Sequence, residues 1–200
     1  MRSRGFTLVE LLVVMTIGAI LVAAAMPSFV WMIATTRASN GTNSLVAAFE
    51  LARSEAIRRG TIVSVCRTLD PNAAPAALAC SNAAGGGFAA GDWGSGCVTF
   101  EKRSAGVPAA GTFDDAGGDI VLQRQQPIGA GNPRLVAQSN LAGAAVAYNR
   151  FGMATSSTGT FAVDYRDPAS GTLTGATRCV FVSVATGRVR VARPTAGVCV

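Results

Sequence analysis

Histidine is absent from this chain of 200 residues, and lysine occurs once, at position 102. Without imidazole the chain can form neither a Ser-His nor a Cys-His catalytic pair, and it can form no histidine metal site. Charged residues make up only 14% of the sequence, and no acid occurs after Asp167. Four arginines follow that last acid, at positions 178, 188, 190 and 193. This basic C-terminal segment is a first indication of an anionic partner.

The five cysteines lack the CxxC spacing of a zinc ribbon and stand at positions 66, 80, 97, 179 and 199. In an exported domain they would form two disulfides and leave one thiol over. Half of the residues are apolar, so the chain is not disordered. Its 23 glycines, eight prolines and sparse charges indicate a β-rich body with many turns. The length suffices for one domain with a core and an appended segment.

Residues 6–26 are almost all apolar. As a helix they would span about 31 Å, which matches the hydrocarbon core of a membrane. Arg2 and Arg4 would hold the N-terminus in the cytoplasm, so the body would lie on the far side, where disulfides form. A charge inside such a segment is costly and usually functional, and Glu10 is such a charge. A cleaved secretory signal, a plain signal anchor and a buried core helix are open alternatives, but none of them needs Glu10.

The segment RGFTLVELL closely resembles the leader of type IV prepilins and pseudopilins. This resemblance implies that a prepilin peptidase cuts after Gly5 and methylates the new N-terminal residue, Phe6. Glu10 would then lie one helical turn from the new amine, in the N-terminal field of the helix, which favours an anion. The resemblance also implies that Glu10 pairs with the amine of a neighbouring subunit and sets the register of helical packing.

Pro27 would loosen the helix by removing one backbone hydrogen bond, but a helical pattern returns over residues 44–59. Apolar residues recur on one face there, at positions 45, 49, 52 and 56. Gly60 is a typical residue just after a helix. We therefore expect one long helix with a membrane half and an amphipathic half. A separate short helix after a linker remains an open alternative, because Gly41 and Asn43 weaken the continuity.

From Thr61 onward the hydrophobic period changes to two, which is typical of strands. Strands are expected at residues 61–67, 96–103, 119–124, 134–138, 144–149, 160–166, 178–184 and 188–193. The predicted fold class is α+β, with the long helix packed on an antiparallel β-sheet domain. The predicted parts are a cleaved leader (1–5), a transmembrane and assembly helix (6–27) and a periplasmic globular domain (28–200).

The body is similar to the FimT/GspH-like branch of the pilin superfamily, which implies the type IV pilin fold. The similarity rests on the segments FELARSEAIRRG, WGSGCVTF, AVAYNRFGMA and CVFVSVATGRVRVAR. Members often carry a second tryptophan where Cys97 stands, so Cys97 is the expected free thiol. Cys66–Cys80 and Cys179–Cys199 are then the expected bridges. Pairing of Cys97 with Cys66 or Cys80 stays open, since sequence does not determine connectivity.

The last two strands are expected to form a hairpin with a tight turn at residues 186–187, which sets Ala185 opposite Arg188. The valines would then share a core face, at positions 180, 182, 184, 189 and 191. Arg188 and Arg190 would point together to the opposite face, with Phe181 and Ser183.

In FimT-like minor pilins a C-terminal Gly-Arg-x-Arg motif is associated with DNA binding during natural transformation, and residues 187–190 match it. Two arginines on one face suit adjacent phosphates, and Gly187 would let a backbone approach closely. Arg178 and Arg193 would widen the patch. Such binding would be independent of sequence and sensitive to salt. An ordinary solvated strand face is the competing interpretation.

The predicted function is therefore a minor pilin of a type IV pilus that binds extracellular DNA for uptake. Its expected partners are other pilins, the prepilin peptidase, the inner membrane before assembly, and DNA; no cofactor, metal or catalytic residue is expected. From the inner membrane it would pass to the cell-surface pilus. Three alternatives are a GspH-type pseudopilin of a type II secretion system, a minor pilin acting only in assembly, and a membrane-anchored periplasmic enzyme. Asp114, Asp115 and Asp119 match no calcium loop and are expected to form a solvated acidic loop.

Overall fold

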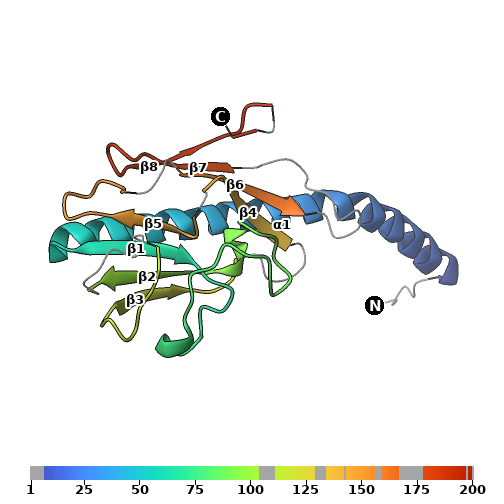
Figure 1. Cartoon of the computed structure of the whole chain (residues 1–200). Helices are drawn as coiled ribbons and strands as arrows, with labels where there is room; N and C mark the ends of the chain where they lie inside the picture. The colour runs from blue at the N-terminus through green and yellow to red at the C-terminus, as the bar shows by residue number, and fades with distance from the viewer. Residues whose placement is uncertain are drawn as a thin grey trace, which may run out of the picture.

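The structure is a computed structural model that describes residues 7–103, 111–128, 134–141, 143–155, 159–166, 178–196 and 198–199. Within these ranges the side chains of residues 24–28, 30, 31, 134, 165 and 166 are not described. One long helix runs along the body and extends past it toward the N-terminus, and the strands lie against the C-terminal half of that helix (Figure 1).

Helix α1 (Leu8–Arg59) has defined caps at both ends. The Thr7 hydroxyl accepts a hydrogen bond from the backbone N–H of Glu10, as a threonine N-cap does. Gly60 takes the left-handed conformation (φ 67°) and donates its N–H to the carbonyl of Ala56. Glu10 in the first turn and the arginines of the last turn complement the helix dipole.

The helix is continuous through positions 27 and 41, so the alternative of a separate short helix is wrong. A glycine inside a helix costs about 1 kcal/mol relative to alanine. At Gly41 tertiary packing explains the residue, because a Cβ there would lie only 2.3 Å from Cδ2 of Leu135. The sheet packs so closely at this point that no larger residue fits without a shift.

In the part of the chain that the structure describes, the strands form two antiparallel sheets of four strands each. The first sheet has the order β3-β2-β1-β5, with β1 (Ile62–Arg67), β2 (Cys97–Lys102), β3 (Ile120–Gln125) and β5 (Ala145–Tyr148). The second has the order β4-β6-β7-β8, with β4 (Arg134–Ser139), β6 (Gly159–Arg166), β7 (Arg178–Val182) and β8 (Val189–Ala192). All eight predicted strands are present, with ends within two residues of the expected ones, and the predicted α+β arrangement of a long helix packed on antiparallel strands is confirmed.

The core lies between α1 and the two sheets. The predicted apolar face of the helix is buried, and Leu45, Phe49, Ala52 and Ala56 are each at most 1% exposed. The ring of Phe49 lies 5.9 Å from that of Trp93 and 5.1 Å from that of Phe161. Trp93 belongs to η2 (Trp93–Ser95), a single turn in the β1–β2 connection that thereby joins the helix to the second sheet.

The long β1–β2 connection, which also contains η1 (Pro75–Ala77), is held by a buried arginine. Arg67 is fully buried at the end of β1 and donates four hydrogen bonds to backbone carbonyls of this connection. The acceptors are the carbonyls of residues 81, 83, 89 and 92. Burial lowers the pKa of Arg67, and the nearby charge of Asp92 opposes that shift. The planar guanidinium fork suits this role, since it presents five donors in one plane.

Among the described residues, no helix is long and apolar enough to cross a membrane. The predicted leader and Phe6 lie outside the described residues. In the described N-terminal part of α1 the apolar side chains are exposed, and Leu8, Val9 and Met15 are each more than 65% exposed.

Candidate nucleic-acid interface

The C-terminal hairpin pairs Phe181 with Arg190 and Val182 with Val189. Its turn is longer than expected, because Ser183, not Ala185, lies opposite Arg188 and donates its N–H to the Arg188 carbonyl. The predicted pairing was therefore wrong by two residues. A shift of two keeps every side chain on its face, since the pleat has a period of two.

The two faces of the hairpin differ in burial. Val180 and Val182 are at most 1% exposed, whereas Val191 is 44% exposed because it lies on the edge strand. Val184 belongs to the turn and not to the core face. Arg188 and Arg190 are exposed, on the face that the sequence pattern indicates.

Arg190 is held over the face of Phe181, with its guanidinium carbon 5.0 Å from the ring centroid. This cation–π contact orients the charge without neutralising it. Phe181, Ser183, Arg188 and Arg190 line a hollow of about 500 Å³ on the outer surface. Arg190 lies on β8 and Arg188 directly precedes that strand, so in extended chain the two arginines start about 7 Å from each other.

Arg178 and Arg193 lie at the opposite end of the hairpin. The register places them across from each other, because Cys179 pairs with Ala192. By alternation they start from the valine side of the pleat and not from the side of Arg188 and Arg190. The structure therefore does not bring the four arginines together on one strand face.

Gly187 has a structural role that the sequence did not reveal. It is left-handed (φ 63°), and a Cβ there would lie 1.8 Å from the carbonyl oxygen of Gly152. The close approach that glycine permits is therefore to the protein's own backbone. Nε of Arg53 on α1 donates to the same Gly152 oxygen at 3.2 Å. The hairpin turn, the 149–152 turn and the helix thus meet at one carbonyl.

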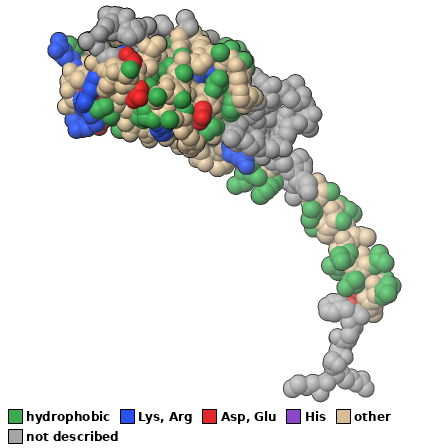
Figure 2. Space-filling model, turned by 60° about the horizontal axis from the view of Figure 1, so that its bottom comes forward, with side chains coloured by type: hydrophobic (Ala, Val, Ile, Leu, Met, Phe, Trp, Pro, Cys, Tyr) green, Lys and Arg blue, Asp and Glu red, His purple; other side chains and the backbone are tan. Residues whose placement is uncertain are grey.

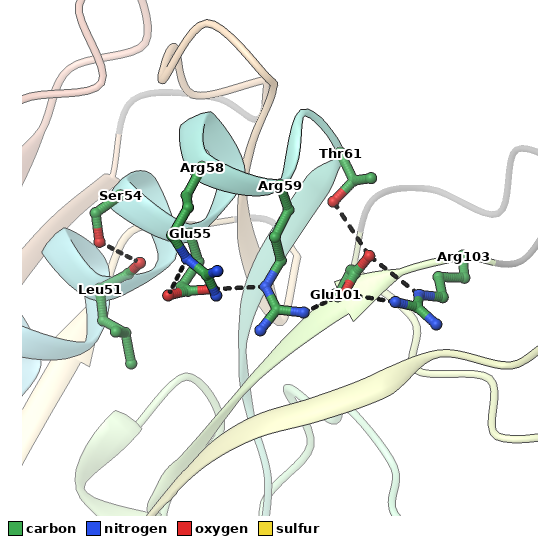
Figure 3. A network of polar contacts seen from close by, with 8 residues as sticks. All are labelled: Leu51, Ser54, Glu55, Arg58, Arg59, Thr61, Glu101 and Arg103. Atoms are coloured by element: carbon green, nitrogen blue, oxygen red, sulfur yellow. Dashed lines mark hydrogen bonds and ion pairs between the residues drawn. The ribbon is translucent and has the colours of Figure 1, made fainter.

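A network of arginines and glutamates joins the end of α1 to β2 (Figure 3). The Glu55 carboxylate accepts from Arg58 and Arg59, and these hydrogen bonds lower the pKa of Glu55 to about 2. Arg59 also donates to Glu101, which accepts a further bond from Arg103. Burial alone raises the pKa of Glu101, but the hydrogen bonds from Arg103 and Arg59 outweigh it and the net pKa is lowered.

This network lies at the same end of the body as the 149–152 turn. A second surface hollow, lined by Gly60, Thr61, Ile62 and residues 149–151, connects the end of α1 with that turn. Lysine and arginine side chains, which Figure 2 colours alike, gather at the end of the body that lies away from the N-terminal part of the helix. The two glutamates of the network are already paired with arginines there.

The structure contains both bridges that the sequence suggested, Cys66–Cys80 and Cys179–Cys199. Cys97 is buried and unpaired. Burial raises the pKa of the Cys97 thiol to about 12, so it stays protonated and unreactive at neutral pH. The second bridge ties the C-terminal tail to the start of β7, beside the candidate interface.

The acidic loop before β3 is structural. Asp119 was expected to be solvated, but it is buried. Its carboxylate accepts hydrogen bonds from Nζ of Lys102 and from the backbone N–H groups of Arg103 and Asp114. Asp114 in turn caps Gly117. In the part of the chain that the structure describes, no group of three acids or cysteines is placed to hold a metal ion.

The remaining predicted site residues are at the N-terminus. Gly5 and Phe6 lie outside the described residues, and Glu10 lies in the first turn of α1. Sequence reasoning missed Arg67 and Phe151. The sequence signal for Phe151 is an aromatic residue inside an Asn-x-x-Gly segment, residues 149–152.

Comparison with known proteins gives two family matches. The family described as type II transport protein GspH matches residues 41–187, and the prokaryotic N-terminal methylation motif matches residues 1–26. Two crystal structures of the type IV minor pilin FimU from Pseudomonas aeruginosa, in space groups P65 and P21, are similar at 20% identity, with TM-scores of 0.46 and 0.47. The similarity covers 78% of this chain and 90% and 86% of the FimU chains. No curated protein matches the chain.

Proposed function

Because the chain belongs to the GspH family of type IV minor pilins and pseudopilins, we propose that it is a minor pilin that binds extracellular DNA during uptake for natural transformation. The observation that supports this proposal is the pair Arg188 and Arg190, exposed on one face of a hairpin without acids. The family match ends at residue 187, so the case for DNA rests on the geometry of the hairpin. Phosphates would be bound by charge-assisted hydrogen bonds from both guanidinium groups.

In this proposal the N-terminal part of the chain serves membrane anchoring and assembly, and the C-terminal hairpin serves DNA binding. The leader, residues 1–5, is cut after Gly5, and Phe6 becomes the methylated N-terminus. Residues 6–27 hold the protein in the inner membrane until it joins the filament, and Glu10 pairs with the amine of a neighbouring pilin. The body, residues 28–200, then presents the hairpin at the surface of the pilus. The protein is structural, and no catalytic step is part of its function.

The test is a mobility shift of duplex DNA by the full chain in detergent over a salt series. Arg188→Gln/Arg190→Gln removes two phosphate contacts. The slope of log K against log salt should then become shallower by about 2, and binding at low salt should be largely lost. Arg37→Gln is the control for the single variant Arg188→Gln, because each removes one exposed charge and Arg37 lies on α1, outside the hairpin.

The result separates the two interpretations of the hairpin. A double variant that binds duplex DNA as well as the parent would make β8 an ordinary solvated strand, and the DNA proposal would be abandoned. An equal loss in Arg37→Gln and Arg188→Gln would show that only net charge matters.

A second candidate is a minor pseudopilin of a type II secretion system, which the description of the matched family favours. It shares the helix and the methylation motif, so the two candidates differ in the machine and not in the fold. Deletion of the gene discriminates them. Loss of DNA uptake with intact protein secretion supports the pilin, and the opposite pattern supports the pseudopilin.

A further inference from the structure

The turn between β5 and β6, residues 149–152, carries an exposed aromatic side chain. Phe151 is 69% exposed, more than any other large apolar side chain of the described body. The guanidinium carbon of Arg150 lies 5.3 Å from the centroid of that ring. An exposed ring beside an arginine is chemically suited to a ligand that has both charge and flat apolar faces.

The turn holds Phe151 outward by its own hydrogen bonds. Oδ1 of Asn149 accepts from the N–H groups of Phe151 and Met153, at 2.9 and 3.1 Å. The backbone N–H of Asn149 donates a hydrogen bond to the carbonyl of Met153, and the carbonyl of Asn149 accepts one from the N–H of Gly152. Gly152, which is left-handed (φ 74°), completes the turn. The ring is therefore presented by a closed turn, so a ligand would order little further chain on binding.

The same turn contacts the C-terminal hairpin. The carbonyl oxygen of Gly152 is in close contact with Gly187. Phe151 directly precedes Gly152 in the sequence, and Arg188 directly follows Gly187. Standard backbone dimensions then keep the Cα atoms of Phe151 and Arg188 within about 13 Å of each other. The backbone contact between Gly152 and Gly187 thus brings together two turns that lie 35 positions apart in sequence.

Proteins that bind single-stranded nucleic acid combine arginines along the backbone with aromatic rings on which bases stack. In a duplex the base faces are covered by their neighbours, so only an unpaired base can stack on Phe151. We propose that the 149–152 turn and the β7–β8 hairpin form one surface for single-stranded DNA, in which Arg188 and Arg190 hold phosphates and Phe151 stacks on a base. This inference rests on the proposed DNA-binding function and adds its substrate form.

Fluorescence anisotropy of the full chain in detergent tests this inference, with a labelled 20-nucleotide thymidine strand and a duplex of equal length. Phe151→Ala should weaken single-strand binding about tenfold, the loss of one stacked base, and leave duplex binding within twofold. Phe151→Trp should retain or strengthen single-strand binding. Phe151→Leu keeps an apolar side chain without a π face and should behave like Phe151→Ala. Met153→Ala, an exposed apolar neighbour, is the control that should change neither.

The outcomes separate this inference from the function on which it rests. Equal single-strand binding by Phe151→Ala and the parent, with duplex binding intact, overturns the role of Phe151 alone. Parent-like binding by Phe151→Leu overturns stacking in favour of a plain apolar contact. Unchanged DNA binding with reduced incorporation of Phe151→Ala into pili would assign the turn to a protein neighbour. A parent that binds neither strand form overturns the proposed function and this inference together.

Discussion

The β1–β2 connection and the β7–β8 hairpin both depend on arginine, but they use it in opposite ways. Arg67 is fully buried, and its guanidinium donates to four carbonyls of its own chain. Arg188 and Arg190 are exposed, and Arg190 lies over an aromatic face with its charge uncompensated by that contact. The buried group uses its donors for the fold, whereas the proposed function assigns the two exposed groups to phosphates. The comparison predicts that stability and binding depend on different arginines.

The largest effect is expected at the buried arginine. Arg67→Met should lower the free energy of unfolding by about 3–5 kcal/mol, because it leaves buried carbonyls without a donor. Arg188→Met should change it by less than about 0.5 kcal/mol, as surface substitutions do. Urea denaturation of the two variants measures both values. Equal stability of Arg67→Met and the parent would contradict the structural role of Arg67.

Each of the two regions also has a disulfide, Cys66–Cys80 in the β1–β2 connection and Cys179–Cys199 at the start of β7. A disulfide stabilises a fold mainly by constraining the unfolded chain. Each closes a short loop, with sequence separations of 14 and 20, so the two should contribute about equally, near 3 kcal/mol each. Cys66→Ala/Cys80→Ala and Cys179→Ala/Cys199→Ala should therefore show similar denaturation midpoints, both below that of the parent. An unchanged denaturation midpoint in either variant would show that the corresponding disulfide does not stabilise the fold.

At the hairpin turn the expected effect is smaller and local. Gly187→Ala should cost about 2 kcal/mol, since alanine is strained at φ 63° and its Cβ would collide with the Gly152 oxygen. Gly118→Ala is the matched control, because Gly118 is also left-handed (φ 83°) but nothing lies within 4 Å of its Cβ position. Thermal melts of both variants give the difference. Equal melting temperatures would show that the two turns do not depend on this close contact.

The smallest effect is expected in the network of arginines and glutamates in Figure 3. In exposure this network is intermediate between the buried Arg67 and the exposed hairpin arginines. The pKa of Glu55 is lowered to about 2 by hydrogen bonds from Arg58 and Arg59. Its contribution to stability is therefore present above about pH 4.5 and is lost as the pH falls toward 2. Glu55→Gln should flatten the pH dependence of stability in that window only. If the stability of the parent and of Glu55→Gln changed in parallel from pH 5 to pH 2, the contribution of Glu55 would be contradicted.

Local patterns predicted much of the fold. The spacing of Leu45, Phe49, Ala52 and Ala56 predicted the buried helix face, and Gly60 predicted its end, because both depend on nearby residues alone. Arg188 and Arg190 lie on the predicted face of the hairpin although its register was wrong by two, since an even shift leaves the alternation intact. The same shift moved Val184 from the predicted core face into the turn. The register itself depends on the turn, and a four-residue turn has no equally clear signature.

By itself the sequence determined the methylation motif, the long helix, the eight strands and the two arginines that share a face. Those features depend on periods of two and 3.6 residues and on short motifs, which act within one element. Only the tertiary structure decided that Gly187 contacts Gly152, which brings the 149–152 turn to the C-terminal hairpin, and that Arg67 is buried. Each of these depends on which distant segments the core brings together, and the packing of α1 against two sheets determines that choice.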